Sequence, residues 1–281
     1  MLKFTKMHGI GNDYVYINAI TQQIDNPNEL AKKLSDRRFS IGGDGVILIC
    51  PSDVADAKMR MFNADGSEGM MCGNGVRCVG KYVYDNLIED KSRDTITIET
   101  LSGIKILKIT AVDGKAELLE VDMGKAELKT ELIPAVFDGC ETVIAKPLVV
   151  DGVEHIVTCV SMGNPHCVTF VPDVDSLELH KIGPGFEMHT SFPQRINTEF
   201  VKVIDDHTLQ MRVWERGSGE TWACGTGACA TAVAAVENGY CKKGEDITVH
   251  LRGGDLIINY TDERVLMTGP ATKVFDGEID I

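Results

Sequence analysis

The sequence has no excess of basic residues and no long apolar run. Its 28 Lys and Arg residues are outnumbered by 42 Asp and Glu, which gives a formal net charge of −14 at pH 7. That balance offers no basic footprint for nucleic acid or an anionic membrane, so we expect neither as a partner. Charges and glycines interrupt the N-terminal segment MLKFTKMHGIGNDYVYINA, and no run reaches the roughly 18 residues of a spanning helix. We therefore expect a cytoplasmic protein.

A regular cysteine framework is also missing. The nine cysteines are odd in number and irregularly spaced, which favours reduced thiols over disulfides. With 43% hydrophobic and 25% charged residues, the composition is that of a globular chain rather than a disordered or coiled-coil one. A length of 281 residues suggests two domains at about 150 residues per domain.

Short segments with alternating or β-branched apolar residues occur along the whole chain and predict strands. They are residues 3–7, 14–17, 46–50, 95–100, 104–109, 154–160, 167–171, 199–204, 208–214, 247–251 and 256–260. Helices are few and do not alternate regularly with these strands. This pattern predicts an α+β protein rather than a doubly wound sheet.

Three helices are predicted. The first follows Asn26, where Asn-Pro-Asn-Glu supplies an N-cap, a first-turn proline and an acidic residue three positions after the cap. The others are GNGVRCVGKYVYDN from Gly73 and GTGACATAVAAVENGY from Gly225. The last is apolar nearly all round between Ala228 and Val236, so we expect strands to enclose it.

The chain contains one internal repeat. FNADGSEGMMCGNG aligns without a gap with WERGSGETWACGTG, and Cys72 and Cys224 are 152 positions apart. The same offset pairs Gly11-Asn12 with Gly163-Asn164. Coincidence among common residues is the alternative, but an offset kept over some sixty residues favours duplication. We expect homologous domains at 1–122 and 123–268, with a C-terminal strand at 269–281 completing the first.

Each half places a cysteine, Cys72 or Cys224, immediately before a glycine-rich helix start. The unpaired N–H groups and the helix dipole there stabilise a thiolate, so we expect the thiol pKa to fall below its usual value of about 8.5. If the halves pack about a pseudo-twofold axis, both cysteines flank one ligand in an interdomain cleft.

Such a pair suits inversion of a carbon stereocentre. One thiolate can remove a proton from one face while one thiol returns a proton to the other face. The backbone N–H groups at Gly73-Asn74 and Gly225-Thr226 can bind a carboxylate. They can also stabilise the negative charge that develops when the neighbouring C–H bond breaks.

Several motifs resemble the diaminopimelate epimerase family: KMHGIGNDYV, FNADGSEGMMCGNGVRC, SMGNPHC, INTEFV, WERGSGETWACGTGACA and the closing MTGPATKVFDG. The resemblance runs from Phe4 over essentially the whole chain. It implies two domains, each a mostly antiparallel strand barrel around a central helix, with the active site in the cleft between them. It also implies cofactor-independent conversion of L,L- to meso-diaminopimelate in lysine and peptidoglycan precursor synthesis, no metal, and a homodimer.

The resemblance assigns roles by position. Cys72 and Cys224 match the acid–base cysteines, and His166 and Glu215 match the polar pair beside them. In the family, the first-half cysteine is the thiolate that faces the L,L substrate. Residues that match substrate-binding positions are Asn12, Asn63, Gly73, Asn74, Asn164, Asn197, Glu215, Arg216, Gly225 and Thr226. One departure is Gly45, where some family members have a glutamine, so no side chain reaches the substrate from this position.

Other interpretations remain open on sequence alone. Small buried thiols can simply fill space, which is what we expect of Cys78 and Cys229 inside the helices. Cys72, Cys78, Cys224 and Cys229 could form a zinc site, although their gaps are long for zinc knuckles. GTGACA fits a dinucleotide-binding pattern but follows no hydrophobic strand. A non-catalytic amino-acid binding protein, a proline racemase or a phenazine-type isomerase would share the cleft.

Overall fold

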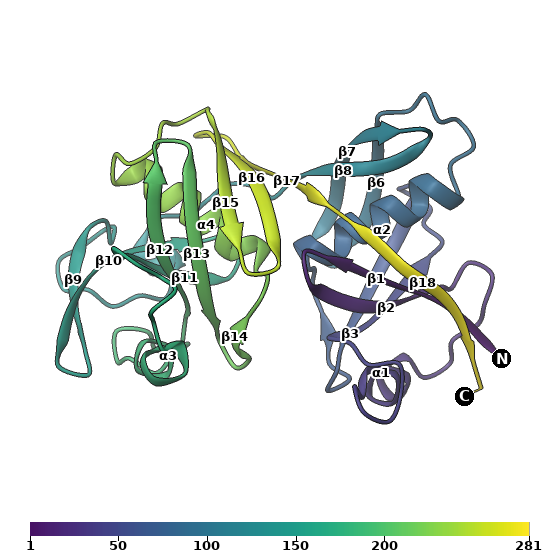
Figure 1. Ribbon diagram of the computed structural model, residues 1–281, viewed down its shortest axis with the longest axis horizontal. Helices are drawn as coiled ribbons and strands as arrows, with labels where there is room; N and C mark the ends of the chain where they lie inside the picture. The colour runs from purple at the N-terminus through teal and green to yellow at the C-terminus, as the bar shows by residue number, and fades with distance from the viewer. Residues whose placement is uncertain (281) are drawn as a thin grey trace. The chain divides into compact units, whose positions relative to one another are not determined.

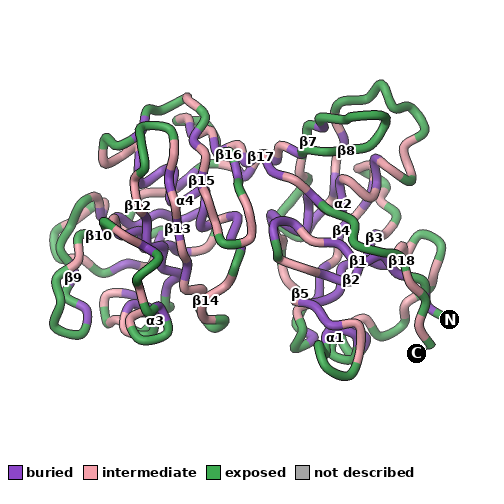
Figure 2. Tube along the Cα trace, viewed as in Figure 1, coloured by how far each residue is buried: buried purple, intermediate pink, exposed green. Residues whose placement is uncertain are grey.

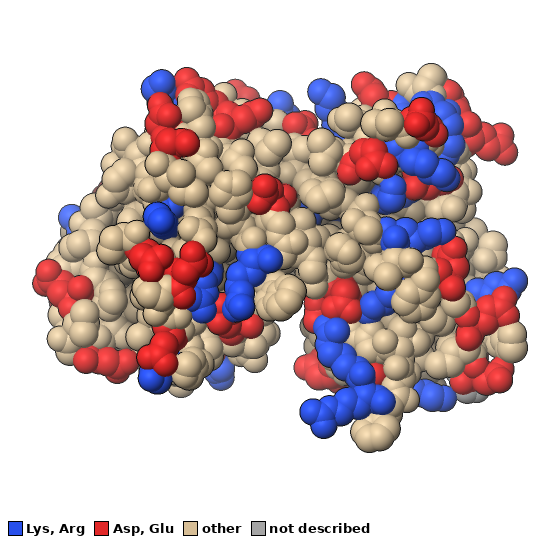
Figure 3. All heavy atoms as spheres, viewed as in Figure 1, with Lys and Arg blue, Asp and Glu red and all other residues tan. Residues whose placement is uncertain are grey.

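The computed structural model describes residues 1–280, which divide into two compact units. The first is Met1–Asp122 with the C-terminal segment that begins at Thr268, and the second is Met123–Met267. The described residues form 18 strands and four α-helices, which confirms the α+β class with few helices. Acidic and basic side chains are both spread over the face drawn in Figure 3. No helix within residues 1–280 is long and apolar enough to cross a bilayer.

The strands of the first unit form one mixed sheet. Hydrogen-bonded neighbours follow the order β18-β1-β2-β3-β4-β6-β7-β8, and β5 forms a hairpin with β4. The β2–β3 and β4–β6 pairs are parallel, and the other neighbouring pairs in this order are antiparallel. The strands are β1 Leu2–Gly9, β2 Asn12–Asn18, β3 Gly45–Cys50, β4 Ala57–Asn63, β5 Glu68–Gly69, β6 Thr95–Thr100, β7 Gly103–Val112, β8 Lys115–Asp122 and β18 Thr272–Ile279.

The second unit repeats the part of this topology that runs from β18 to β7. Its order is β9-β10-β11-β12-β13-β15-β16, with β14 on β13, and its parallel pairs are β11–β12 and β13–β15. The register repeats too, because Tyr14 faces Gly45 in the first unit as His166 faces Asn197 in the second. The strands are β9 Lys146–Val150, β10 Val153–Ser161, β11 Pro165–Phe170, β12 Asn197–Asp205, β13 Thr208–Glu215, β14 Gly219–Thr221, β15 Asp246–Leu251, β16 Gly254–Tyr260 and β17 Val265–Pro270, which spans the division.

Each sheet wraps around one central helix (Figure 1). The helix α2, Gly73–Asn86, contacts β1, β2, β4, β6 and β8. The helix α4, Gly225–Glu237, contacts β10 to β13, β15 and β16, and its residues from Gly227 to Ala235 are buried (Figure 2). Small side chains allow this enclosure: a Cβ on Gly80 of α2 would lie 2.5 Å from a methyl carbon of Leu107 and 2.7 Å from one of Leu119.

The two remaining helices lie outside the barrels. The predicted helix after Asn26 is α1, Pro27–Ser35, with Asn26 as its N-cap residue, Pro27 in its first turn and Glu29 as the acidic residue of that turn, although the Asn26 side chain makes no capping hydrogen bond. The helix α3, Leu179–Glu187, was not predicted, since Pro184 and two glycines weaken its helical propensity. Packing holds it instead, because Gly183 lies directly against the ring of Trp214. A single 3₁₀ turn spans Thr130–Leu132.

The packing of α2 against β7 and β8 leads to a stability prediction. In Gly80→Val, the added methyl groups would overlap Leu107 and Leu119, so we expect the first unit to lose about 1–3 kcal/mol of unfolding free energy. Urea unfolding followed by circular dichroism measures this. Asn86→Val, which adds the same side chain at the exposed end of the same helix, is the matched control. Equal midpoints for both variants would contradict the close packing at Gly80.

Candidate active site

Both repeat cysteines are helix N-caps. Cys72 precedes α2 with φ −130° and ψ 122°, and its sulfur accepts a hydrogen bond from the Gly75 N–H at 3.4 Å. Cys224 precedes α4 with φ −120° and ψ 106°, and its sulfur accepts from the Gly227 N–H at 3.3 Å. The extended backbone at each cap points the thiol back over the first helical turn, among the N–H groups of that turn.

In the first unit, polar partners surround Cys72. Its thiol donates to Asn12 Oδ1 at 3.3 Å, and Asn12 Nδ2 donates to Asp44 Oδ2 at 2.6 Å. Arg37 in turn pairs with Asp44 at 2.8 Å. Asn12 is thereby oriented from both sides, with its amide oxygen directed at the sulfur.

Two further predicted positions of this unit have distinct environments. The Asn74 side chain is buried and accepts from the fully buried Arg77 at 2.9 Å, so it is directed into the unit. Asn63 ends β4, beside the hairpin turn, and donates to Ser67 Oγ at 3.0 Å.

In the second unit, a chain of contacts leads away from Cys224. Its sulfur lies 3.6 Å from Thr226 Oγ1, which accepts from Asn164 Nδ2 at 3.2 Å. Asn164 Oδ1 lies 3.1 Å from His166 Nε2, and His166 Nδ1 lies 2.7 Å from Glu199 Oε1. The side chains of His166 and Glu199 are fully buried. The structure therefore brings Cys224, Thr226, Asn164 and His166 together in one cluster.

Glu215 belongs to the same cluster. It ends β13, accepts a hydrogen bond from the Thr221 hydroxyl, and is hydrogen-bonded to the Cys224 thiol. Burial raises the pKa of Glu215 above its usual value, against the lowering effects of these hydrogen bonds and of His166.

The pKa of Cys224 differs from the sequence-based expectation. Burial raises it well above the usual thiol value, and the negative charges of Glu215 and Glu199 raise it further. The hydrogen bonds from Thr226 and Gly227 oppose this rise without cancelling it. The prediction that its helix start lowers the pKa of this cysteine is therefore wrong, because a partial dipole charge is outweighed by desolvation and two nearby carboxylates.

Asn197 and Arg216 are tied to the protein backbone. Asn197 Nδ2 donates to the Pro165 carbonyl at 2.9 Å, and its Oδ1 accepts from the Arg216 N–H at 2.9 Å. Arg216 Nη1 donates to the Gln194 carbonyl at 2.9 Å. These bonds fix the ends of β11, β12 and β13 relative to one another, and these ends carry His166, Asn197 and Glu215.

Gly45 has no room for a side chain. A Cβ at this position would lie 2.0 Å from the carbonyl oxygen of Phe62 on the neighbouring strand β4. This backbone therefore leaves no space for the glutamine side chain that some family members carry at this position. Asn197 occupies the equivalent position in the second unit.

Three residues of these clusters, Glu199, Thr221 and Asp44, are not among the predicted site residues. Glu199 had a readable signal: it is a charged residue within a strand whose first five residues, Asn197 to Val201, are all buried. A carboxylate in such a run is unusual without a buried partner. Thr221 and Asp44 had no comparable signal, because their partners are set only by the fold.

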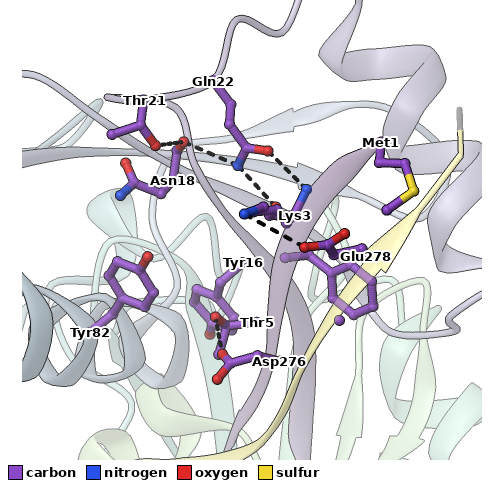
Figure 4. Close-up of a pocket in the computed structure, with 12 residues that line it drawn as sticks. Met1, Lys3, Thr5, Tyr16, Asn18, Thr21, Gln22, Tyr82, Asp276 and Glu278 are labelled. Carbon is purple, nitrogen blue, oxygen red and sulfur yellow. Dashed lines mark hydrogen bonds and ion pairs between the residues drawn. The ribbon is translucent and has the colours of Figure 1, made fainter.

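The first unit contains a cavity that the predicted site residues do not line. The cavity has a volume of about 650 Å³ and is lined by residues of β1, β2 and β18 together with Tyr82 of α2 (Figure 4). Polar pairs line it, including Thr5 with Asp276 at 2.8 Å and Lys3 with Glu278 at 3.6 Å, but none of the predicted site residues does. Within residues 1–280, no three His, Cys, Asp or Glu side chains are grouped so as to hold a metal ion.

Solved structures share the fold of this chain. A phenazine biosynthesis protein of the PhzF family from Bacillus anthracis matches with a TM-score of 0.72 and 17% identity, covering 100% of this chain and 99% of that one. A probable proline racemase from Agrobacterium radiobacter matches with a TM-score of 0.71 and 13% identity, covering 100% and 93%. At these identities the likeness establishes a shared fold.

The family follows from closer relatives. The family model for diaminopimelate epimerase matches residues 4–129 and 158–274. Proteins named diaminopimelate epimerase from Methanococcus maripaludis and Acetivibrio thermocellus are each 58% identical over 282 residues, covering this whole chain and 100% and 99% of theirs. One from Bacillus mycoides is 50% identical, covering 98% and 96%. The chain belongs to the diaminopimelate epimerase family and is an isomerase.

The environment of Cys224 predicts its reactivity. Because burial and two carboxylates raise its pKa, the midpoint of its alkylation by iodoacetamide should lie at a higher pH than that of Cys224 in the urea-unfolded chain. Mass spectrometry of the Cys224 peptide over a pH series measures this. The midpoint, not the rate, is diagnostic, because burial slows alkylation at every pH. A lower midpoint in the folded protein would contradict the raised pKa.

Proposed function

We propose that the protein epimerises L,L-diaminopimelate to meso-diaminopimelate with Cys72 and Cys224 as its two acid–base groups. The observation that carries this proposal is the pair of cysteine N-caps at matching positions of two repeated units, in a chain 58% identical to relatives named for this reaction. The mechanism requires the two sulfur atoms to reach opposite faces of one α-carbon.

The proton balance of the reaction closes with these two groups alone. A thiolate removes the α-proton and becomes a thiol, and the electron pair of the broken C–H bond remains on the substrate. The other thiol then donates its proton to the opposite face and becomes a thiolate. The two sulfurs have exchanged protonation states, so the same site serves the reverse reaction. No cofactor is needed for this exchange.

The substrate carboxylate at the reacting centre is proposed to bind at the two helix starts. Gly73-Asn74 and Gly225-Thr226 present backbone N–H groups there, and these would also stabilise charge that builds up as the C–H bond breaks. Asn12, Asn63, Asn164, Asn197, Glu215 and Arg216 are proposed to hold the rest of the substrate. Arg216 offers a guanidinium suited to a carboxylate.

Three wider features accompany this proposal. Two working thiols require a reducing compartment, so we place the reaction in the cytosol, within lysine and peptidoglycan precursor synthesis. We also propose a homodimer. The exposed Val274 and Phe275 on β18 offer apolar surface for such a contact in the first unit.

The reaction itself is testable in heavy water. The reduced protein with L,L-diaminopimelate and no added cofactor should yield meso product that carries deuterium at the α-carbon, because the donated proton comes from a solvent-exchanged thiol. Isomer analysis measures the meso product, and mass spectrometry measures its deuterium content. If the protein binds the ligand but yields neither deuterium exchange nor meso product, it would be a binding protein or an enzyme for a different substrate. Proline would then be tested next.

The roles of the cysteines are tested by substitution. Cys72→Ala and Cys224→Ala should each reduce epimerisation by about 100- to 10,000-fold, because each removes one of two required proton-transfer groups. Cys78→Ala and Cys229→Ala are matched controls, since each removes a buried thiol from the same helix. They should lower stability and leave turnover nearly unchanged. Wild-type turnover by Cys224→Ala would refute the two-thiol mechanism.

A further inference from the structure

One buried carboxylate of the second unit is not explained by the proposed mechanism. Glu199 on β12 is fully buried, with its Oε1 bonded to His166 and its Oε2 buried without a hydrogen-bond partner. Burying a carboxylate costs free energy that a single hydrogen-bonded partner does not fully recover. A residue that is costly for folding is a candidate for a role in the chemistry.

The first unit shows that the fold does not need this carboxylate. The repeat offset of 152 places Ile47 of β3 at the position of Glu199, and Tyr14 of β2 at that of His166. The packing is also equivalent. A Cβ on Gly75 would lie 2.8 Å from the Ile47 side chain, and one on Gly227 would lie 2.7 Å from Glu199 Oε1. An apolar residue therefore fills the same place beneath the first helix start.

Glu199 is linked to the reacting thiol. Contacts run from its carboxylate through the His166 ring to Asn164, then to Thr226 and the Cys224 sulfur. Because Asn164 donates to Thr226, its amide oxygen faces His166 Nε2, so both ring nitrogens face oxygen atoms. A proton on Nδ1 satisfies the contact with the Glu199 carboxylate.

The carboxylate also acts on the sulfur through its charge. Glu199 Oε1 and Cys224 Sγ lie 2.7 Å and 3.1 Å from the same point, the ideal Cβ position of Gly227, so they are less than 6 Å apart. The titratable groups around this sulfur are Glu215 from β13, Glu199 from β12 and His166 from β11. Burial, Glu215 and Glu199 all raise the pKa of Cys224.

We propose that Glu199 is a positioning residue that makes the two halves of the site chemically different: it orients His166 and keeps Cys224 protonated as the proton donor. Its counterpart Ile47 places no charge beneath Cys72. The duplicated fold thus supplies two similar thiols, and one buried carboxylate distinguishes them. This inference rests on the proposed role of Cys224 in proton transfer.

The test removes the charge and keeps the shape. In Glu199→Gln, the midpoint for alkylation of Cys224 by iodoacetamide in the ligand-free protein should fall by about one pH unit. The pKa that defines the basic limb of the pH profile of kcat/KM should fall by a similar amount when the reaction is measured in the direction in which Cys224 donates its proton. Glu199→Asp, which restores the charge, should return both toward the wild-type values. Glu220→Gln removes a carboxylate that is paired with Arg212 and Arg252 in the same unit, and should change neither.

Two further measurements keep the inference testable if Glu199→Gln does not fold. The double variant His166→Tyr/Glu199→Ile imports the pair that the first unit carries at this place, and its Cys224 midpoint should also fall. Nitrogen-15 NMR of the wild-type protein should show a proton on His166 Nδ1. An unprotonated Nδ1, or an unchanged Cys224 midpoint in a folded variant without the carboxylate, would overturn the inference. Failure of the proposed function would appear separately, either as no meso product from the wild-type protein or as wild-type epimerisation by Cys224→Ala.

Discussion

The hydrogen bond from a backbone N–H to the sulfur of a capping cysteine is the interaction around which each unit is organised. It fixes the thiol at the first turn of a helix that strands enclose on many sides. The donor three residues after each cysteine is a glycine, Gly75 or Gly227, and a Cβ there would collide with the strand beneath. Glycine allows the buried strand, the helix start and the sulfur to lie this close together.

Duplication supplies the pair of thiols, and divergence beneath the helix starts gives them different surroundings. Cys72 faces an amide that Asp44 and Arg37 orient near the surface, whereas Cys224 is enclosed with Glu215, Thr221 and the His166–Glu199 pair. A site that must remove a proton from one face and deliver one to the other needs two groups in different protonation states. In the proposed mechanism, the difference arises within one unit, from side chains on three adjacent strands.

Much of the fold could be predicted from local sequence. Strands such as Thr95–Thr100 alternate strictly between buried and half-buried residues, and both central helices begin where glycines follow a cysteine. The strand β4 was missed although Met59 and Met61 alternate with charged residues, because its mixed composition weakens the pattern. The helix α3 could not be predicted, because contact with Trp214 stabilises it against its own glycines and proline.

The sequence by itself determined the repeat, the family and the placement of two cysteines at helix starts, because these depend on residue order and on short-range backbone geometry. Only the tertiary structure decided the electrostatics of the Cys224 site. Glu215 and Glu199 come from strands 9 and 25 positions before the cysteine, and their effect depends on distance and burial, which no local pattern encodes. The dipole of a helix start is a local property, but the desolvation that outweighs it belongs to the folded chain.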